Sequence, residues 1–143
     1  MYEWADKNKT TPKTSAPSIE TAMNVMRPYI DEGREIICFS ISSEMSTSIN
    51  VIRMAAEELD AVDKVTVIDS RNLSTGIGLL VVEAAVMAAD GKSREEIKAG
   101  IDELIPKVRA SFVVDTLVYL YRGGRCNAVS ALIGLSLIHI SEP

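Results

Sequence analysis

The sequence has little of the chemistry that metal sites and disulfide scaffolds require. It contains two cysteines and one histidine in 143 residues. Neither Cys38 nor Cys126 has a second ligand at metal-binding spacing. We therefore interpret both as free thiols in a reducing compartment, and we expect no metal.

A basic surface and a long hydrophobic run are also lacking. The formal net charge is −5, which argues against binding to nucleic acid or to an anionic membrane. The longest apolar run, residues 76–82, is interrupted by Glu83 and is too short for stable membrane insertion. Residues 1–13 are polar and charged and show no signal-peptide pattern, so we expect a cytoplasmic protein.

What is present predicts a folded domain in which helices and strands alternate. Hydrophobic residues make up 47% of the chain, enough for a sizeable core. Apolar residues at helical spacing predict helices within residues 18–33, 49–59, 75–89 and 93–108, with a helical turn at 117–121. Short Val- and Ile-rich runs predict strands at 35–41, 64–69 and 110–115. This order predicts an α/β fold, a parallel sheet with helices on both faces.

Local signals mark the ends of these elements. Ser18 is expected to cap its helix, and Pro28 to kink or shorten that helix. Ser93 and Glu96 form a predicted capping box. The helix at 75–89 is apolar on nearly every side, so we expect it to be buried on more than one side.

The two ends of the chain do not fit a complete doubly wound domain. Residues 1–17 show no periodicity and are predicted to form a loop. Residues 1–135 are interpreted as one partial α/β domain. Residues 136–143 form a short apolar tail that we expect to be foreign to it.

Polar side chains follow each predicted strand. In an open parallel sheet, ligands bind beyond the carboxyl ends of the strands, and right-handed crossovers place these ends on one edge. We therefore expect one polar edge, built from Ser42 and Ser43 after the first strand, Asp69, Ser70 and Arg71 after the second, and Asp115 and Thr116 after the third.

Residues 40–48 (SISSEMSTS) carry six hydroxyl side chains. A flexible linker or a Walker-type phosphate loop would need glycines, which this stretch lacks. A nucleophile elbow would need flanking glycines and a histidine base, and the only histidine is His139. What remains is helix capping by one or two of Ser42, Ser43 and Ser46, with the other hydroxyls free to donate to an acyl or carboxyl oxygen.

Two other functions stay open at this point. One is a small-molecule hydrolase or acyl-transfer enzyme with a Ser nucleophile, which the missing base disfavours. The other is a nucleotide-binding half-domain, for which the only sign is Gly76 and Gly78. A close contact between a helix and the sheet explains these glycines equally well.

Four segments in order resemble the DegV family of bacterial fatty-acid-binding proteins. Residues 12–18 (PKTSAPS) resemble its PKTSQPS loop, and residues 42–46 (SSEMS) stand where the family has SSGLSGT-like loops. Residues 67–80 resemble its VIDSR…GLGLL segment. Residues 114–125 (VDTLVYLYRGGR) resemble its VDTLEYLRKGGR segment. The resemblance covers residues 12 to about 135.

The resemblance implies the three-layer, Rossmann-like N-terminal domain of a two-domain DegV-type fold, incomplete at both ends. Such a protein binds a fatty acid in an apolar tunnel and presents the carboxylate to a partner fatty acid kinase, so it is a carrier and not an enzyme. No other cofactor is implied. The implied residues are Thr14, Ser43 and Ser42 for the carboxylate, Ser15, Ser70, Arg71 and Thr116 at the pocket edge, and Arg125 for kinase contact.

Three positions depart from the family pattern. Ala16 replaces a glutamine, while Glu44 and Thr47 replace glycines. A carboxylate at Glu44 beside a bound carboxylate is unfavourable unless it points to solvent.

Overall fold

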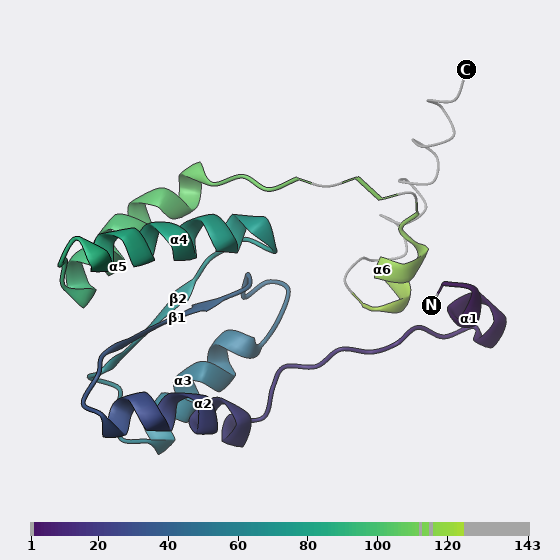
Figure 1. The fold of residues 1–143 in the computed structure, drawn as a ribbon. Coiled ribbons are helices and arrows are strands. Elements are labelled where there is room, and N and C mark those ends of the chain that lie inside the picture. The colour runs from purple at the N-terminus through teal and green to yellow at the C-terminus, as the bar shows by residue number, and fades with distance from the viewer. Residues whose placement is uncertain (1, 112, 115, 125–143) are drawn as a thin grey trace. The chain divides into compact units, whose positions relative to one another are not determined.

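The computed structural model describes residues 2–111, 113–114 and 116–124 (Figure 1). The chain divides into two compact units. The larger unit is Ser15–Ala110, and the smaller one combines Met1–Thr14 with Ser111–Pro143.

The larger unit is built on two parallel strands. Strand β1 (Ile36–Ser40) pairs with β2 (Val65–Asp69) in a register that places Ile36 opposite Val65 and Ser40 opposite Asp69. Helix α3 (Ser48–Glu58) makes the crossover between them. Parallel pairing requires such a connection, because a hairpin cannot join strands that run in the same direction.

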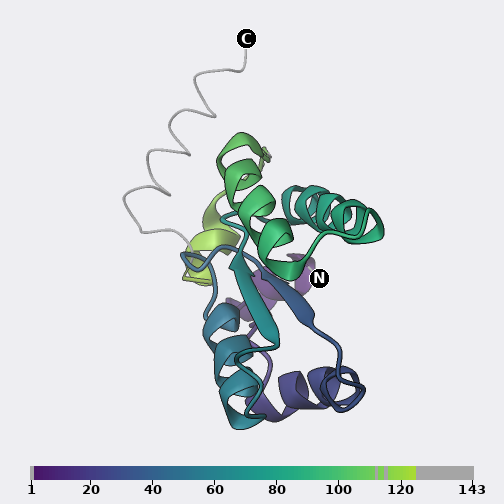
Figure 2. The same ribbon diagram turned by 90° about the vertical axis from the view of Figure 1, so that its left-hand side faces the viewer.

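Helices cover both faces of this sheet (Figure 2). On one face, α2 (Ile19–Asp31) and α3 enclose a core that includes Met26, Ala55 and Val65. On the other face, α4 (Thr75–Ala89) and α5 (Arg94–Leu104) enclose a core that includes Leu80 and Ile101. The predicted parallel sheet between two helical layers is therefore confirmed.

The alternation of side chains along β1 supplies both cores. Ile36 and Cys38 pack with the α2–α3 core, while Ile37 and Phe39 pack with the α4–α5 core. Successive strand residues point to opposite faces of a sheet, so a continuous apolar run suits a strand covered on both sides.

Most predicted helix boundaries are confirmed. The Ser18 Oγ accepts the Thr21 N–H at 3.1 Å at the start of α2. The helix continues past Pro28 to Asp31, so Pro28 does not end it early. Helix α5 begins with the predicted capping box. It ends at Leu104, where a 3₁₀ turn (Ile105–Lys107) containing Pro106 takes over.

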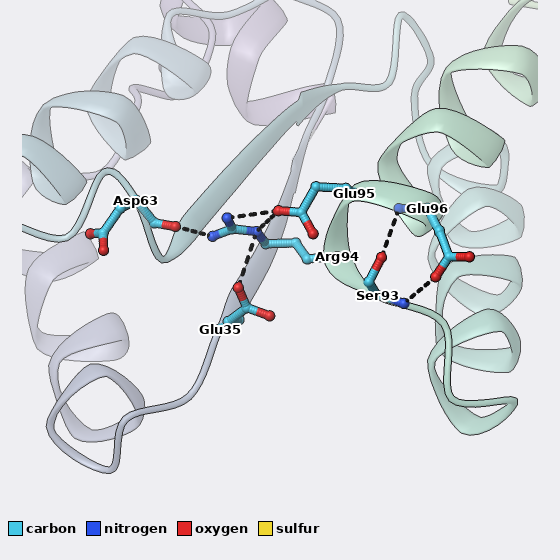
Figure 3. Close-up of polar contacts among 6 residues, drawn as sticks. All are labelled: Glu35, Asp63, Ser93, Arg94, Glu95 and Glu96. Atoms are coloured by element: carbon cyan, nitrogen blue, oxygen red, sulfur yellow. Dashed lines mark hydrogen bonds and ion pairs between the residues drawn. The ribbon is translucent and has the colours of Figure 1, made fainter.

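The first residue of α5 ties that helix to the amino ends of both strands (Figure 3). The Arg94 guanidinium donates to the Asp63 carbonyl before β2 and pairs with the Glu35 carboxylate before β1 at 3.5 Å. It also contacts Glu95 at 2.9 Å. The Arg94 side chain is only 16% exposed, so these contacts fix α5 at the sheet edge opposite to the carboxyl ends of the strands.

The prediction of a third strand at 110–115 is wrong for the residues that the structure describes there. Residues 110, 111, 113 and 114 lie in no strand, and Val113 is 99% exposed. The described sheet contains only β1 and β2. A β-prone run becomes a strand only where a neighbouring strand accepts its backbone hydrogen bonds, and the sequence alone does not supply that neighbour. Asp115 lies outside the described residues.

The predicted loop over residues 1–17 is also wrong in part, because α1 (Tyr2–Asn8) is a helix. The Tyr2 ring contacts the Tyr119 ring of α6 (Val118–Arg122) at 4.9 Å between centroids. The Asp6 carboxylate accepts from the Tyr119 hydroxyl at 2.9 Å and from Arg122 at 3.2 Å. A seven-residue helix is marginal alone, so contacts more than 110 residues away in sequence stabilise it.

Helix α4 corrects a third expectation. Its buried residues lie on one side, Gly76, Leu80, Ala84 and Met87. Leu79 and Val82 on the other side are 64% and 63% exposed. The apolar composition of α4 therefore exceeds what the described part of the larger unit covers, because the sheet and α5 pack against one side only.

Candidate functional site

The parallel register brings the two predicted polar loops together at one edge of the sheet. Ser40 and Asp69 end their strands as register partners, so residues 41–47 and 70–74 leave the sheet side by side. This is the edge at which open parallel sheets bind ligands. Ser42, Ser43, Asp69, Ser70 and Arg71 all lie here, as predicted for the first two strand ends.

Asp69 links the two loops through one carboxylate oxygen. Its Oδ1 accepts the Ser43 N–H at 3.2 Å and the Arg71 N–H at 3.0 Å. Burial alone would raise the pKa of Asp69. Hydrogen bonds from the Ser43 side chain and from the N–H groups of Arg71 and Ser43 outweigh burial and hold the pKa below its usual value of 3.8. The carboxylate is therefore ionised at neutral pH.

Ser70 is placed inside the protein and not on its surface. It is 0% exposed, and its Oγ donates to the Ser40 carbonyl at 2.6 Å. The same oxygen accepts the Asn72 N–H at 3.2 Å. Ser70 thus joins the ends of β1 and β2, and its hydroxyl is engaged in holding the edge together.

Asn72 is a site residue that sequence reasoning missed. Its carbonyl accepts the Ser42 N–H at 3.0 Å, and its side-chain amide donates to the Ser70 carbonyl at 3.1 Å. Its Oδ1 would lie 2.5 Å from a Cβ added to Gly76. A side chain at position 76 would therefore clash with Asn72, which explains the glycine there. This glycine was the only sign of Asn72 in the sequence.

Hydrogen bonds within the serine-rich loop add to its contacts with Asp69 and Asn72. The Ser42 Oγ accepts the Glu44 N–H at 3.3 Å, and Ser42 is only 8% exposed. The expectation that Ser42, Ser43 or Ser46 caps α3 is wrong, because none of them stands at its N-cap. Thr47 stands at the N-cap of α3 without a side-chain cap, and Ser46 Oγ accepts the Ser48 N–H at 3.2 Å.

Ser43 and Glu44 both lie at the surface of this loop. The hydroxyl of Ser43 is thus within reach of a ligand from solvent. Glu44 is exposed, so solvent screens its carboxylate from a carboxylate bound at this loop.

The remaining predicted residues are distributed over both units. Ser15 is exposed in the larger unit. Thr14 and Thr116 belong to the smaller unit. Thr14 is exposed, and the Thr116 Oγ1 accepts the Val118 N–H at 3.2 Å at the start of α6. Arg125 and His139 lie outside the described residues.

An apolar groove lies on the α2–α3 side of β1. It has a volume of about 340 Å³, and its lining includes Val25, Met26, Ile36, Cys38 and Ile52. Burial raises the pKa of the Cys38 thiol, so this side chain is neutral and adds to the apolar lining. The groove can accept hydrocarbon and offers little to a polar ligand.

Within residues 2–111, 113–114 and 116–124, no helix is long and apolar enough to cross a bilayer. The same described residues contain no group of three or more His, Cys, Asp or Glu side chains that could hold a metal ion.

Comparison with known proteins identifies the relatives of this chain. A family model described as "Uncharacterised protein, DegV family" matches residues 1–140. A DegV domain-containing protein of Clostridium acetobutylicum is 40% identical over 131 residues, which are 88% of this chain and 45% of that protein. One of Caldanaerobacter subterraneus is 35% identical over 134 residues, 94% of this chain and 47% of that protein.

Solved structures show the same relationship. A DegV-family protein of Thermus thermophilus, described as binding fatty acid, superimposes with a TM-score of 0.74 at 32% identity over 87% of this chain and 44% of its own. A stearic-acid-binding protein of Eubacterium ventriosum gives 0.71 at 30% identity over 90% and 46%. The chain thus spans less than half the length of each of these relatives.

Proposed function

Because the chain belongs to the DegV family, we propose that it forms the head-group end of a binding site for a long-chain fatty acid. Relatives in this family bind fatty acids, the protein of Thermus thermophilus among them. The fatty acid is the ligand in this proposal, and no other cofactor is invoked.

The observation that carries the proposal is the ordered serine loop at the carboxyl edge of the sheet. The Ser42 N–H is held by the Asn72 carbonyl, and the Ser43 N–H by Asp69, so the loop is fixed before a ligand arrives. A pre-organised site loses less entropy on binding. The Ser43 hydroxyl lies at the surface of this loop beside Asp69, and in the complex it would donate to a carboxylate oxygen of the ligand in place of Asp69.

We assign the carboxylate contacts to Thr14, Ser43 and Ser42, and the pocket edge to Ser15, Ser70, Arg71 and Thr116. Within this group, Ser70 acts from the interior, because it is fully buried. The apolar groove beside β1 is the surface in the larger unit best suited to contact hydrocarbon.

We also propose that the protein is a carrier that presents the carboxylate to a fatty acid kinase in the cytoplasm, with Arg125 in the kinase contact. In this scheme the kinase transfers the phosphoryl group from ATP to the bound carboxylate. An assay of acyl phosphate formation with a fatty acid kinase, ATP and the lipid-loaded chain tests this part. We expect formation with the wild type and a loss with Arg125→Ala at unchanged lipid content. Equal rates for both proteins would contradict the assignment.

The binding proposal is tested by mass spectrometry of the chain purified from bacteria. We expect copurified fatty acid in the wild type and less of it in Ser43→Ala and Thr14→Val, because each change removes a hydroxyl donor. Ser111→Ala is the matched control, since it removes an exposed hydroxyl from a residue to which no ligand contact is assigned. Absence of lipid from the wild type, or equal lipid in all variants, would overturn the proposal.

A further inference from the structure

We propose that Asp69 is the positioning residue of the head-group loop, holding Ser43 in the place where its hydroxyl meets the ligand carboxylate. The inference rests on the proposed function and adds to it a residue that does not itself contact the fatty acid. Asp69 was expected only as part of the polar edge.

The geometry places Asp69 between the two loops. As the last residue of β2, it is held in the sheet by its pairing with Ser40. Its Oδ1 accepts one N–H from each loop, Ser43 at 3.2 Å and Arg71 at 3.0 Å. A single atom at the end of β2 thus contacts two loop residues that are 28 positions apart in sequence.

Ser43 depends on this contact more than its neighbour does. Ser42 is buried and is held by the Asn72 carbonyl and by the turn that it forms with Glu44, Met45 and Ser46. Ser43 is exposed, and the Asp69 carboxylate accepts both its backbone N–H and its hydroxyl. Without that acceptor, Ser43 would keep its hydroxyl but lose its defined position.

Asp69 also stabilises the backbone conformation of Arg71. Its φ of +48° lies in the left-handed region, which costs free energy for a residue with a side chain. The hydrogen bond from the Arg71 N–H to Asp69 offsets part of this cost. The Arg71 charge also favours the ionised carboxylate.

The charge of Asp69 opposes ligand binding while its oxygen supports it. An ionised carboxylate near a bound carboxylate is electrostatically unfavourable, whereas the acceptor oxygen orders the loop. Asparagine at position 69 retains an acceptor without the charge, and alanine removes both. The proposal therefore predicts that Asp69→Asn binds at least as tightly as the wild type. Asp69→Ala should bind about tenfold more weakly, the equivalent of one charge-assisted hydrogen bond.

The test combines a ligand titration with a spectroscopic measurement that needs no ligand. Fluorescence titration with cis-parinaric acid gives the affinity of the wild type, Asp69→Asn, Asp69→Ala and Ser43→Ala, with circular dichroism to check that each is folded. In parallel, ¹H–¹⁵N NMR follows the amides of Ser43 and Arg71 from pH 6 to acid. We expect both amides to shift together with one pKa below 3.8 in the wild type, and neither to do so in Asp69→Asn.

Each outcome decides the inference. Equal weakening in Asp69→Asn and Asp69→Ala would overturn it, since the charge and not the acceptor would then matter. Independent titration of the Ser43 and Arg71 amides, or none, would also overturn it. If the wild type does not bind cis-parinaric acid, the proposed function fails, and the NMR titration still shows whether Asp69 holds both loops. If Asp69→Ala does not fold, Asp69→Asn and the amide titration decide alone.

Discussion

Replacing Ser70 by alanine removes a single oxygen atom, yet it should lower the free energy of unfolding of the larger unit markedly. The Ser70 side chain is fully buried at the junction of β1 and β2, where its Oγ donates to the Ser40 carbonyl, accepts the Asn72 N–H and lies 3.3 Å from the Asn72 carbonyl. The substitution removes one oxygen atom from this junction and leaves the rest of the sheet unchanged.

The magnitude follows from what each partner loses. The Ser40 carbonyl retains the Ser70 backbone N–H at 3.2 Å, so it stays satisfied. The Asn72 N–H loses its acceptor in a partly buried position. An unsatisfied buried donor costs about 1–3 kcal/mol, so we expect the free energy of unfolding to fall by about 2 kcal/mol.

Urea denaturation followed by circular dichroism measures this change. With a slope of about 1–3 kcal/mol per molar urea, the midpoint should fall by about 1 M. Ser43→Ala is the matched control, because its hydroxyl at the same edge is exposed and its hydrogen bond to Asp69 is replaced by water, so stability should change by less than about 0.5 kcal/mol. If Ser70→Ala unfolds at the same urea concentration as Ser43→Ala, the role assigned to the buried hydroxyl is refuted.

Three further predictions concern the rest of the larger unit. Ser93→Ala removes the acceptor of the Glu96 N–H in the capping box and should cost about 1 kcal/mol in urea denaturation, while an unchanged midpoint would show that α5 needs no cap. Ile101→Ala empties a fully buried position and should cost about 2–5 kcal/mol in the same measurement, and a loss below that range would mean that the core collapses around the gap. Because the folded-state pKa of Asp69 is lowered, its ionisation stabilises the fold above the unfolded-state pKa, and this contribution is lost as pH falls through the folded-state value. The melting temperature of the wild type should thus exceed that of Asp69→Asn near pH 6, with a difference that shrinks below pH 3.8 and would be constant if Asp69 were unperturbed.

Much of the fold could be predicted because its signals are local. The capping box at Ser93 and Glu96 was predicted within four residues of sequence, and the structure contains it. The strands β1 and β2 and the helix α4 lie where their hydrophobic patterns predicted them. The convergence of Ser43 and Asp69 followed from the general geometry of parallel sheets.

The features that the sequence did not predict depend on contacts between distant residues. Helix α1 forms through contacts between Asp6 and α6, and the exposed side of α4 depends on which segments pack against it. The run at 110–115 has the composition of a strand, yet its described residues have no partner strand.

The order of the helices and strands, the family and the composition of the polar edge follow from the sequence, because periodicity, capping and motifs are properties of neighbouring residues. The role of each polar side chain at that edge depends on tertiary contacts. Ser42, Ser43 and Ser70 are the same residue type, but Ser70 is buried after the end of β2 and bonds to the end of β1, while Ser43 is exposed and bonds to Asp69. Burial and hydrogen-bond partners assign these roles, and both arise only when β1 and β2 are side by side.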